Sequence, residues 1–547
     1  MKMNNHIENY PKPSYRQIEW YKREKTAFFH FGMNTFTGNA WGDGNDPAEL
    51  FNPSDLDCKQ WVSTVKQAGF TCAILTAKHH DGFCLWPSKY TDYSVKSSPY
   101  KNGCGDVVKE FTDACAQYGI KAGLYLSPWD RHEHTYGTDA YNDYYVNQLT
   151  ELLTNYGKIY ECWWDGAGSL EADYDWGRWA YTVRNLQPDC IIFGSLGAAH
   201  FAETRWVGNE SGITQDNCWA TLKKKTLLDE VADEMNIGCP DGDIFVPAEV
   251  DTSIRPGWFY LQEQDESVKT SSELFRYWFN SIGSNAGMLL NVPPMPNGKL
   301  NNLDIDSLLR ANALEKQTFA VNLAWGANVS GKFADKILND DEEYYECDSL
   351  NKTITVQLKE NTVFDCISIS EKIDFGHRVL NFEIEALVKG EWKSLLKAEC
   401  IGYKRAFYFE PIKARKIRIK LIGRDKPLIR HFGIYKLPDG CFDEEIKIKN
   451  NVDLSKTKIA RLHINDTEIE VDFGGIYPFN TVKFNGLGIE KYEVQAFDGT
   501  KYYTICNGTR PSDKQIVSFS TVIGSYKMRI IANSGMFKNP DISIVEL

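Results

Sequence analysis

Two short polar segments of this chain carry side chains that could act as nucleophiles, acids or bases. Residues 78–83 read Lys-His-His-Asp-Gly-Phe, and residues 163–166 read Trp-Trp-Asp-Gly. Each segment ends a run of β-branched or aromatic residues, which is how a barrel strand delivers functional side chains at its carboxyl end. Paired imidazoles, tryptophans and an aspartate on one face suit an anionic nucleophile surrounded by sugar hydroxyls. The pattern therefore predicts a glycosidase.

Asp165 is the predicted nucleophile of this glycosidase. Hydrolysis with retention needs one carboxylate that attacks the anomeric carbon and one carboxylic acid that protonates the leaving oxygen, about 5–5.5 Å apart. Asp165 ends the run 159–164 and precedes Gly166, which lets the chain turn sharply and leaves the carboxylate exposed at the barrel end. In the alternative interpretation, Asp165 only caps the next helix.

The elements that must position these residues alternate regularly from about residue 20 to residue 325. Strand-like runs are followed by amphipathic helical stretches, as in βα units around a parallel barrel. The expected strands are 26–33, 71–77, 120–126, 159–165, 190–195, 204–208, 244–250 and 287–292. The clearest helices are 58–68, 106–118, 141–156 and 271–282. Eight such strands predict an α/β fold, a (β/α)8-like catalytic barrel over residues 1–325.

The rest of the chain has the pattern of an all-β protein, with short alternating strands separated by Gly, Asn, Asp and Lys turns. Residues 382–386 (Phe-Glu-Ile-Glu-Ala) reappear as 492–496 (Tyr-Glu-Val-Gln-Ala), and 417–419 (Ile-Arg-Ile) as 528–530 (Met-Arg-Ile). We therefore expect two related β-sandwich modules, 326–440 and 441–547, which resemble discoidin-type domains. Their aromatic residues, including Trp392, Tyr502 and Tyr503, face a glycan or only cover the sheets, and both roles stay open.

Composition excludes several classes of protein. The chain has 547 residues, a formal charge of −13 and no run of Lys and Arg, which argues against nucleic-acid binding. The 14 cysteines are scattered without a C-x-x-C pair, so neither a zinc module nor a disulfide framework is expected. No stretch is apolar enough to span a bilayer or to serve as a signal peptide. We expect a soluble, cytoplasmic protein, although a chain whose leader had been removed would look the same.

Several motifs follow one another along the barrel segment. They are His30-Phe31-Gly32, Trp41, residues 78–83, residues 123–127 (Gly-Leu-Tyr-Leu-Ser), residues 163–166, residues 205–212 (Arg-Trp-Val-Gly-Asn-Glu-Ser-Gly), residues 254–259 (Ile-Arg-Pro-Gly-Trp-Phe) and residues 289–293 (Leu-Leu-Asn-Val-Pro). In this order they resemble the motifs of the α-L-fucosidases of glycoside hydrolase family 29. The resemblance covers roughly residues 15–325.

The resemblance implies a retaining mechanism on α-L-fucosides, with Asp165 as the nucleophile and no cofactor. The residues that match the family's fucose-binding site are His30, Trp41, His79, His80, Tyr125 and Trp163. Neutral histidines can both donate to and accept from sugar hydroxyls. Metal binding by His79, His80 and Asp81 is disfavoured, because adjacent residues of a strand point to opposite faces.

Two carboxylates compete for the role of acid/base. Glu210 matches the branch of the family that cleaves α-1,3/1,4-linked fucose, whereas Glu249 lies nearer the acid/base of the broader-specificity branch. Residues 247–249 (Pro-Ala-Glu) and 255–259 (Arg-Pro-Gly-Trp-Phe) resemble the first branch, so we assign Glu210 and expect Glu249 to organise the substrate site. Glu210 then needs a raised pKa. Trp206 and Trp258 are candidates for contact with the leaving sugar.

The expected function is therefore a retaining exo-α-L-fucosidase that removes terminal α-1,3/1,4-linked fucose from branched, Lewis-type oligosaccharides. One alternative is a broad-specificity α-L-fucosidase that also cleaves α-1,2 links and uses Glu249 as acid/base. Another is a fucose-binding protein without catalytic activity, which the presence of both Asp165 and Glu210 disfavours. The expected partners are fucosylated oligosaccharides or glycoconjugates, with neither nucleic acid nor membrane, and the oligomeric state is open.

Overall fold

The computed structural model describes residues 10–167, 172–214, 216–229, 232–442, 461–484, 488–497, 501–509, 511, 515–537 and 542–545. The chain divides into two compact units, Met1–Cys441 and Phe442–Leu547. The boundary expected near residue 325 lies inside the first unit, between α10 (Asn302–Phe319) and the short strand β11 (Asn328–Val329). No helix of the described residues is both long enough and apolar enough to cross a bilayer.

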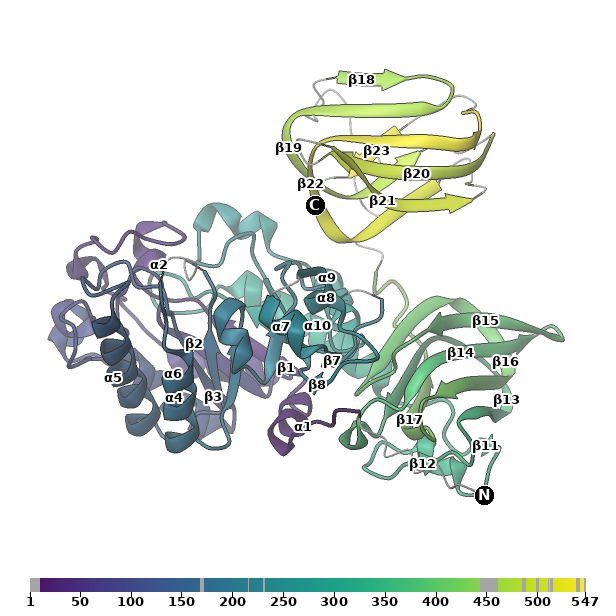
Figure 1. Cartoon of the computed structure of the whole chain (residues 1–547), viewed down its shortest axis with the longest axis horizontal. Helices are drawn as coiled ribbons and strands as arrows, with labels where there is room; N and C mark the ends of the chain where they lie inside the picture. The colour runs from purple at the N-terminus through teal and green to yellow at the C-terminus, as the bar shows by residue number, and fades with distance from the viewer. Residues whose placement is uncertain are drawn as a thin grey trace. The chain divides into compact units, whose positions relative to one another are not determined.

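A closed parallel barrel of eight strands forms the first part of the chain, in agreement with the predicted fold (Figure 1). Its strands are β1 (Lys25–Phe29), β2 (Cys72–Lys78), β3 (Lys121–Leu126), β4 (Glu161–Trp164), β5 (Ile191–Gly194), β6 (Thr204–Trp206), β9 (Ala248–Ser253) and β10 (Ala286–Asn291). Each pairs in parallel with its sequence neighbours in the barrel, and β1 closes the barrel against β10. The carboxyl ends of all eight strands therefore meet at one end.

The seventh barrel strand starts later than the sequence predicts. The hydrophobic run predicts a strand over 244–250, but Ile244–Phe245 forms β8, which pairs antiparallel with β7 (Thr221–Leu222), and the barrel strand β9 begins at Ala248. Pro247 lies between the two pieces, and a proline cannot donate a backbone hydrogen bond to a ladder. The chain consequently leaves one sheet before Pro247 and joins the other after it.

The helices cover the outside of the barrel, and the four predicted most clearly are present. They are α3 (Cys58–Gln67), α4 (Val107–Tyr118), α5 (Asp139–Asn155) and α9 (Ser271–Asn280). Side chains of Asp57, Asp106 and Thr270 accept hydrogen bonds from the first turns of α3, α4 and α9, which satisfies otherwise unpaired amides. The other helices are α1 (Tyr15–Tyr21), α2 (Met33–Thr37), α6 (Trp176–Leu186), α7 (Lys224–Asp229) and α8 (Ala232–Ile237).

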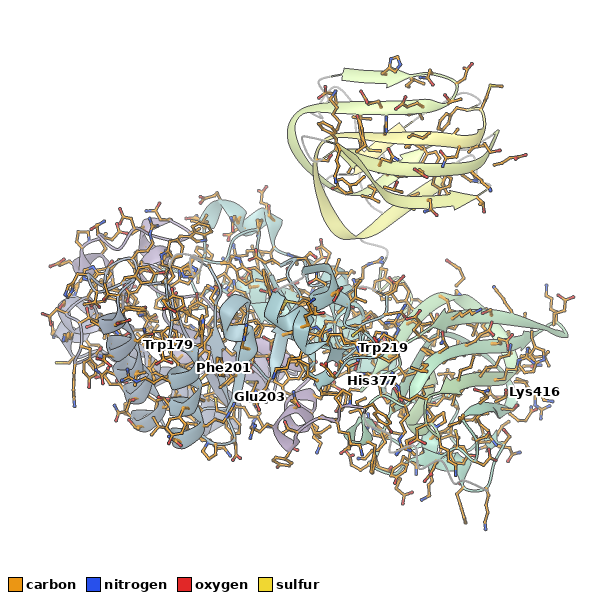
Figure 2. All side chains as sticks on the ribbon, in the orientation of Figure 1. Trp179, Phe201, Glu203, Trp219, His377 and Lys416 are labelled. Carbon is orange, nitrogen blue, oxygen red and sulfur yellow. The ribbon has the colours of Figure 1, made fainter. Side chains whose placement is uncertain are left out.

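The first β-sandwich completes the first unit. Besides β11 it contains β12 (Tyr345–Glu346), β13 (Asn351–Glu371), β14 (Val379–Val388), β15 (Glu391–Ala398), β16 (Arg405–Gly423) and β17 (Leu428–Tyr435). The long strands β13 and β16 contain register shifts and share an apolar core with the strands beside them. Its contact with the barrel is polar and aromatic: His377 Nε2 accepts from the amide of Ala220 at 3.0 Å, and its ring lies 5.1 Å from that of Trp219 (Figure 2).

The second unit repeats the strand pairing of the first sandwich. Its strands are β18 (Arg461–Ile464), β19 (Glu468–Phe484), β20 (Ile489–Phe497), β21 (Tyr502–Thr509), β22 (Gln515–Gly535) and β23 (Ile542–Val545). Glu385 pairs with Arg418 in the first module, and Gln495 pairs with Arg529 in the second. The segments that repeat in the sequence thus occupy matching strands, which supports the interpretation of two related modules.

Candidate active site

Asp165 lies directly after β4, at the carboxyl end of the barrel. Its Oδ2 accepts a hydrogen bond from Tyr125 Oη at 3.1 Å, and its Oδ1 accepts from the amide of Ala167 at 2.9 Å. The His80 Nε2 atom is 3.8 Å from Oδ2. The next described helix, α6, is capped by Asp175. The Asp165 side chain is 27% exposed, so its carboxylate is held in place and still accessible to a ligand.

Three histidines line the same end of the barrel. His30 Nδ1 donates to Asn291 Oδ1 at 2.9 Å, and His80 Nδ1 lies 2.7 Å from Ser127 Oγ. Burial lowers the pKa of His30 to about 3 and that of His79 well below its usual value. Burial also lowers the pKa of His80, although the charge of Asp165 opposes this change. The three rings are therefore neutral near pH 7, a state in which an imidazole can both donate and accept a hydrogen bond.

His79 differs from the other two histidines because its Nδ1 is buried and has no hydrogen-bond partner among the described residues. Buried polar atoms are almost always paired, so an unpaired one is typical of a site that a ligand completes. The His79 ring stacks on Tyr125 at 5.7 Å and meets the edge of Phe259 at 5.0 Å. Phe259 is buried and adds an apolar surface beside these imidazoles.

Trp41 and Trp129 form an aromatic surface next to His80. Trp41 is 58% exposed, and its ring lies 6.4 Å from His80 and 5.7 Å from Trp129. The Arg131 guanidinium lies 5.2 Å from the centre of the Trp129 ring. Exposed tryptophans can cover the C–H faces of a sugar. The sequence motifs point to Trp41 but not to Trp129, which is carried here by the loop after β3.

Glu210 lies in the exposed loop that follows β6, with a positive φ of 50°. This left-handed conformation is unfavourable for a residue with a side chain and is common at functional sites. Desolvation raises the pKa of the Glu210 carboxyl, a hydrogen bond from Trp258 opposes the rise, and the charge of Asp165 adds to it. The loop thus brings Glu210, Trp258 and Asp165 within electrostatic reach of one another.

A family model described as alpha-L-fucosidase matches residues 3–313, more than half of the chain. This protein belongs to the α-L-fucosidase family. Alpha-L-fucosidase 1 of Arabidopsis thaliana is 39% identical over 448 residues, which cover 78% of this chain and 87% of the relative. A crystal structure of a glycoside hydrolase 29 family member from an unknown rumen bacterium is 32% identical, with a TM-score of 0.74 and coverage of 98% and 99% of the two chains.

A second solved structure carries the sugar itself. A GH29 fucosidase of Ruminococcus gnavus in complex with fucose is 35% identical, with a TM-score of 0.73, and the match covers 79% of this chain and 96% of that one. The chain is therefore a glycoside hydrolase of the α-L-fucosidase family, with the barrel and β-sandwich architecture described above.

Glu249 is a buried carboxyl on β9 of this fucosidase. It is 1% exposed inside the barrel, where it accepts a hydrogen bond from Trp163 Nε1 at 2.9 Å. Burial raises the pKa of Glu249 well above its usual value, and the neighbouring Glu161 raises it further. Glu161 in turn forms a 3.0 Å ion pair with Arg23. The hydrogen bond from Trp163 to Glu249 therefore fixes the orientation of the Trp163 ring, and this fits a positioning role for Glu249 better than proton transfer to a substrate.

Asp251 is an acidic residue near the site that the sequence does not single out. It lies two positions after Glu249 on β9, is 3% exposed and accepts a hydrogen bond from Trp206 Nε1 at 2.8 Å. Burial, followed by the charges of Glu210 and Asp165, raises the pKa of Asp251 to about 7. Side chains two residues apart on a strand share a face, so Asp251 stands one level nearer the carboxyl end than Glu249. Trp206 is thereby tied to the barrel wall.

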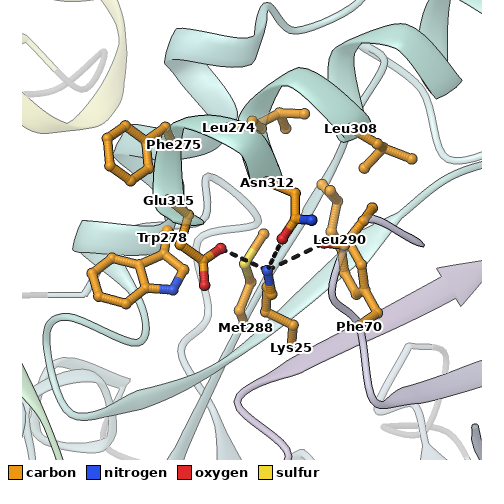
Figure 3. Close-up of a pocket in the computed structure, with 12 residues that line it drawn as sticks. Lys25, Phe70, Leu274, Phe275, Trp278, Met288, Leu290, Leu308, Asn312 and Glu315 are labelled. Atoms are coloured by element: carbon orange, nitrogen blue, oxygen red, sulfur yellow. Dashed lines mark hydrogen bonds and ion pairs between the residues drawn. The ribbon is translucent and has the colours of Figure 1, made fainter. Parts of the chain in front are cut away.

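Other candidate sites in the first unit are weaker. No group of three His, Cys, Asp or Glu side chains in the described ranges could hold a metal ion. A crevice between the barrel and helices α9 and α10 has a volume of about 20 Å³, room for about one water (Figure 3). Lys25 Nζ in this crevice donates to Glu315 at 2.6 Å and to Asn312 at 3.2 Å (Figure 3). This lysine is already satisfied and acts in packing.

Proposed function

We propose that this α-L-fucosidase works with retention through a fucosyl ester on Asp165, with Glu210 as acid/base, and removes terminal α-1,3/1,4-linked fucose from branched, Lewis-type oligosaccharides. The observation that carries the proposal is the pairing of an accessible, hydrogen-bonded carboxylate, Asp165, with a second carboxyl, Glu210, whose pKa is raised partly by the charge of Asp165. Two carboxyl groups with different protonation in one site are what a retaining glycosidase needs.

In the first step, the Asp165 Oδ2 or Oδ1 atom attacks C1 of fucose while the glycosidic C1–O bond breaks. The protonated Glu210 gives its proton to the leaving oxygen, so the departing sugar leaves as an alcohol. Tyr125 Oη fixes the orientation of the Asp165 carboxylate during the attack. The charge of Asp165 is lost when the ester forms, which lowers the pKa of Glu210 and prepares it to act as a base.

In the second step, Glu210 removes a proton from water, and the water oxygen attacks C1. The bond between C1 and Asp165 breaks, and the carboxylate is restored together with the protonated Glu210. The neutral imidazoles of His30, His79 and His80 hold the three sugar hydroxyls through both steps. The unpaired Nδ1 of His79 supports its assignment to one of these hydroxyls.

The proposed preference for branched substrates rests on the loop that carries Trp258. Arg255 on this loop is buried and forms 2.9 Å and 2.8 Å ion pairs with Asp304 and Asp265, while its guanidinium stacks on Tyr260 at 4.5 Å. A loop fixed in this way holds Trp258 in one position beside the leaving sugar. Glu210, which is hydrogen-bonded to Trp258, is held with it. A preorganised wall favours a compact, branched partner over a flexible linear one.

Two comparisons test the proposal. Rates on a Lewis trisaccharide and on a linear α-1,2-linked fucoside should differ by at least about tenfold in favour of the trisaccharide, and equal rates would favour the broad-specificity alternative. Glu210→Ala should retain activity on an activated aryl fucoside and recover further with azide, while Asp165→Ala should lose nearly all activity. If Glu249→Ala shows the azide rescue instead, the acid/base assignment is wrong, and if wild type releases no fucose at all, the protein only binds it.

A further inference from the structure

The outer face of the first sandwich carries rows of cross-strand side chains. On β16, Lys416, Arg418 and Lys420 alternate with the buried Ile417 and Ile419, so the three cations share the solvent face. Two of the cations are neutralised by β14: Lys420 lies 3.0 Å from Glu383, and Arg418 forms a hydrogen-bonded pair with Glu385. Opposite charges across adjacent strands are the usual arrangement on such a face.

Lys416, the third of these cations, has no opposite charge across from it on either neighbouring strand. Ala386 pairs with Ile417, so the position on β14 beside Lys416 is Leu387, which carries no charge. On the other side, Gln357 of β13 pairs with Lys416. Lys416 is exposed and, in the part of the chain that the structure describes, forms no ion pair, and the same is true of Arg415 and Lys389 nearby. Three cations thus take no part in the ion pairs of the described residues, although the chain carries a net charge of −13.

These cations line a concave surface, which we call the tip groove. It has a volume of about 550 Å³ and is lined by Gln357, Asn361, Leu387, Lys389, Gly390, Arg415 and Lys416, none of which is acidic. Arg415 Nε donates to the carbonyl of Leu358 at 3.2 Å, which orients the guanidinium. Figure 2 shows Lys416 at the edge of the sandwich farthest from the barrel, so the tip groove is separate from the site at Asp165.

The second sandwich provides an internal comparison. Lys527 on β22 occupies the position that Lys416 occupies on β16. Its neighbours across the sheet are Phe497 on β20 and Asp472 on β19, which correspond to Leu387 and Gln357 beside Lys416. Lys527 is neutralised there, with Asp472 at 3.3 Å and Glu470 at 3.8 Å. The first module has Gln357 in the place of Asp472. Thr355 likewise stands in the place of Glu470, so β13 presents neither of the two carboxylates that Lys527 has on β19.

Two of the aromatic residues that the sequence singles out, Trp392 and Tyr502, are covered by arginines of these faces, whereas Tyr503 is 37% exposed. The Arg418 guanidinium lies 4.1 Å from the Trp392 ring centre, and that of Arg529 lies 3.9 Å from the ring centre of Tyr502. Stacked arginines stabilise the sheet faces and keep the rings in place. The two modules therefore share the stacked arginine. They differ in the charge next to the lysine, which is paired with carboxylates at Lys527 and, among the described residues, not at Lys416.

We infer that the tip groove binds an anionic group of a carbohydrate, a carboxylate or a sulfate, through Lys416, Arg415 and Lys389. Cationic side chains grouped in a concavity attract and hold oxyanions, and arginine and lysine do so without a further partner. The Gln357 Nε2 atom donates to the carbonyls of Leu358 and Arg415, so its Oε1 atom and the Asn361 amide can pair with neighbouring sugar hydroxyls, and Leu387 can contact a sugar ring. A second binding site raises the concentration of attached fucosylated chains around the catalytic site.

The binding assay uses the full-length protein and four probes. Dissociation constants at about 50 mM salt would be measured by calorimetry for a sulfated tetrasaccharide, an oligogalacturonate, a neutral tetrasaccharide of the same length and a short DNA duplex. We expect binding of the sulfated or the carboxylated probe, which identifies the source of the anion, and at least about tenfold weaker binding of the neutral one. Affinity should fall as salt increases, because exposed charges are screened.

Three variants separate the tip groove from general surface charge. Arg415→Ala/Lys416→Ala should weaken binding of the acidic sugar by at least about tenfold, and Gln357→Asp, which recreates the acidic neighbour of Lys527, should weaken it several-fold. The matched control Lys527→Ala should bind like wild type, and all variants should keep wild-type rates on an aryl fucoside and wild-type melting temperatures.

Several results would overturn the inference. These are equal losses in Lys527→Ala and in the double variant, equal affinity for the neutral probe, no binding of either acidic sugar, or DNA bound as tightly as the acidic sugars with the same dependence on Lys416. Because the aryl fucoside rate is measured in the same variants, failure of this inference is distinguishable from failure of the proposed catalytic function.

Discussion

Replacement of Asp251 by asparagine should remove a pH-dependent decrease in the free energy of unfolding. The Asp251 carboxyl is buried, and its pKa is raised from 3.8 to about 7. Below about pH 3 the group is protonated in both the folded and the unfolded chain. As pH rises, the unfolded chain releases the proton while the folded chain retains it, so stability falls between about pH 4 and pH 7. At about 1.4 kcal/mol per pKa unit, the total loss is about 4 kcal/mol.

The asparagine side chain in Asp251→Asn would stay neutral at every pH and could still accept the hydrogen bond from Trp206 Nε1. The difference in free energy of unfolding between Asp251→Asn and wild type should therefore grow by about 4 kcal/mol from about pH 4 to about pH 8 in favour of the variant. Urea unfolding followed by tryptophan fluorescence at several pH values measures this difference. Titrating groups that do not interact with Asp251 are common to both proteins and cancel, whereas Glu210 and Glu249 lie near its charge and are part of the measured difference.

The matched control is Asp143→Asn, because Asp143 is a surface residue with a side chain that is 67% exposed. Its 2.6 Å ion pair with Arg178 is exposed to solvent and contributes little, so the effect of this replacement should be small. The reasoning is refuted if the difference for Asp251→Asn stays constant within about 1 kcal/mol across the range, since Asp251 would then titrate alike in the folded and unfolded chains.

Three further predictions concern the site and its supports. Tyr125→Phe, which removes the hydrogen bond to Asp165, should lower kcat on fucosides by about 10- to 100-fold, and an unchanged kcat would show that the bond is dispensable. Lys78→Met should destabilise the barrel by about 3–5 kcal/mol in urea unfolding, because buried Asp130, now 2.7 Å from Lys78 Nζ, would lose its counter-charge. A chain that ends at Cys441 should remain soluble and hydrolyse an aryl fucoside at a rate within about twofold of the wild-type rate. The reason is that the second unit has its own apolar core. Insolubility of the shortened chain would show that the first unit depends on the second.

The elements that the sequence predicts well are those whose signals are local. Asp106 before a helical run and a glycine after it define α4, and the apolar run before Trp164 defines β4. The start of β9 is missed because Pro247 divides a run that looks continuous in hydrophobicity. Hydrophobic pattern alone does not report which sheet a strand joins.

The site residues are harder to predict because their roles depend on depth along the barrel. Glu249 and Asp251 share a face of β9, and only the structure separates the deeper residue, held by Trp163, from the one nearer Glu210. Trp129 and Phe259 approach the histidines through loops of unrelated sequence position. Tertiary packing of this kind leaves no periodic signal in the chain.

The two proposed catalytic carboxyls are carried by very different pieces of backbone. Asp165 follows directly on a hydrogen-bonded barrel strand, whereas Glu210 belongs to an exposed loop with a strained conformation. Insertions and deletions are tolerated in loops and disrupt strands. Evolution can therefore relocate the proton donor while the attacking oxygen stays fixed, and engineers who wish to change which linkage is cut should graft loops after β6 and leave the strand of Asp165 untouched.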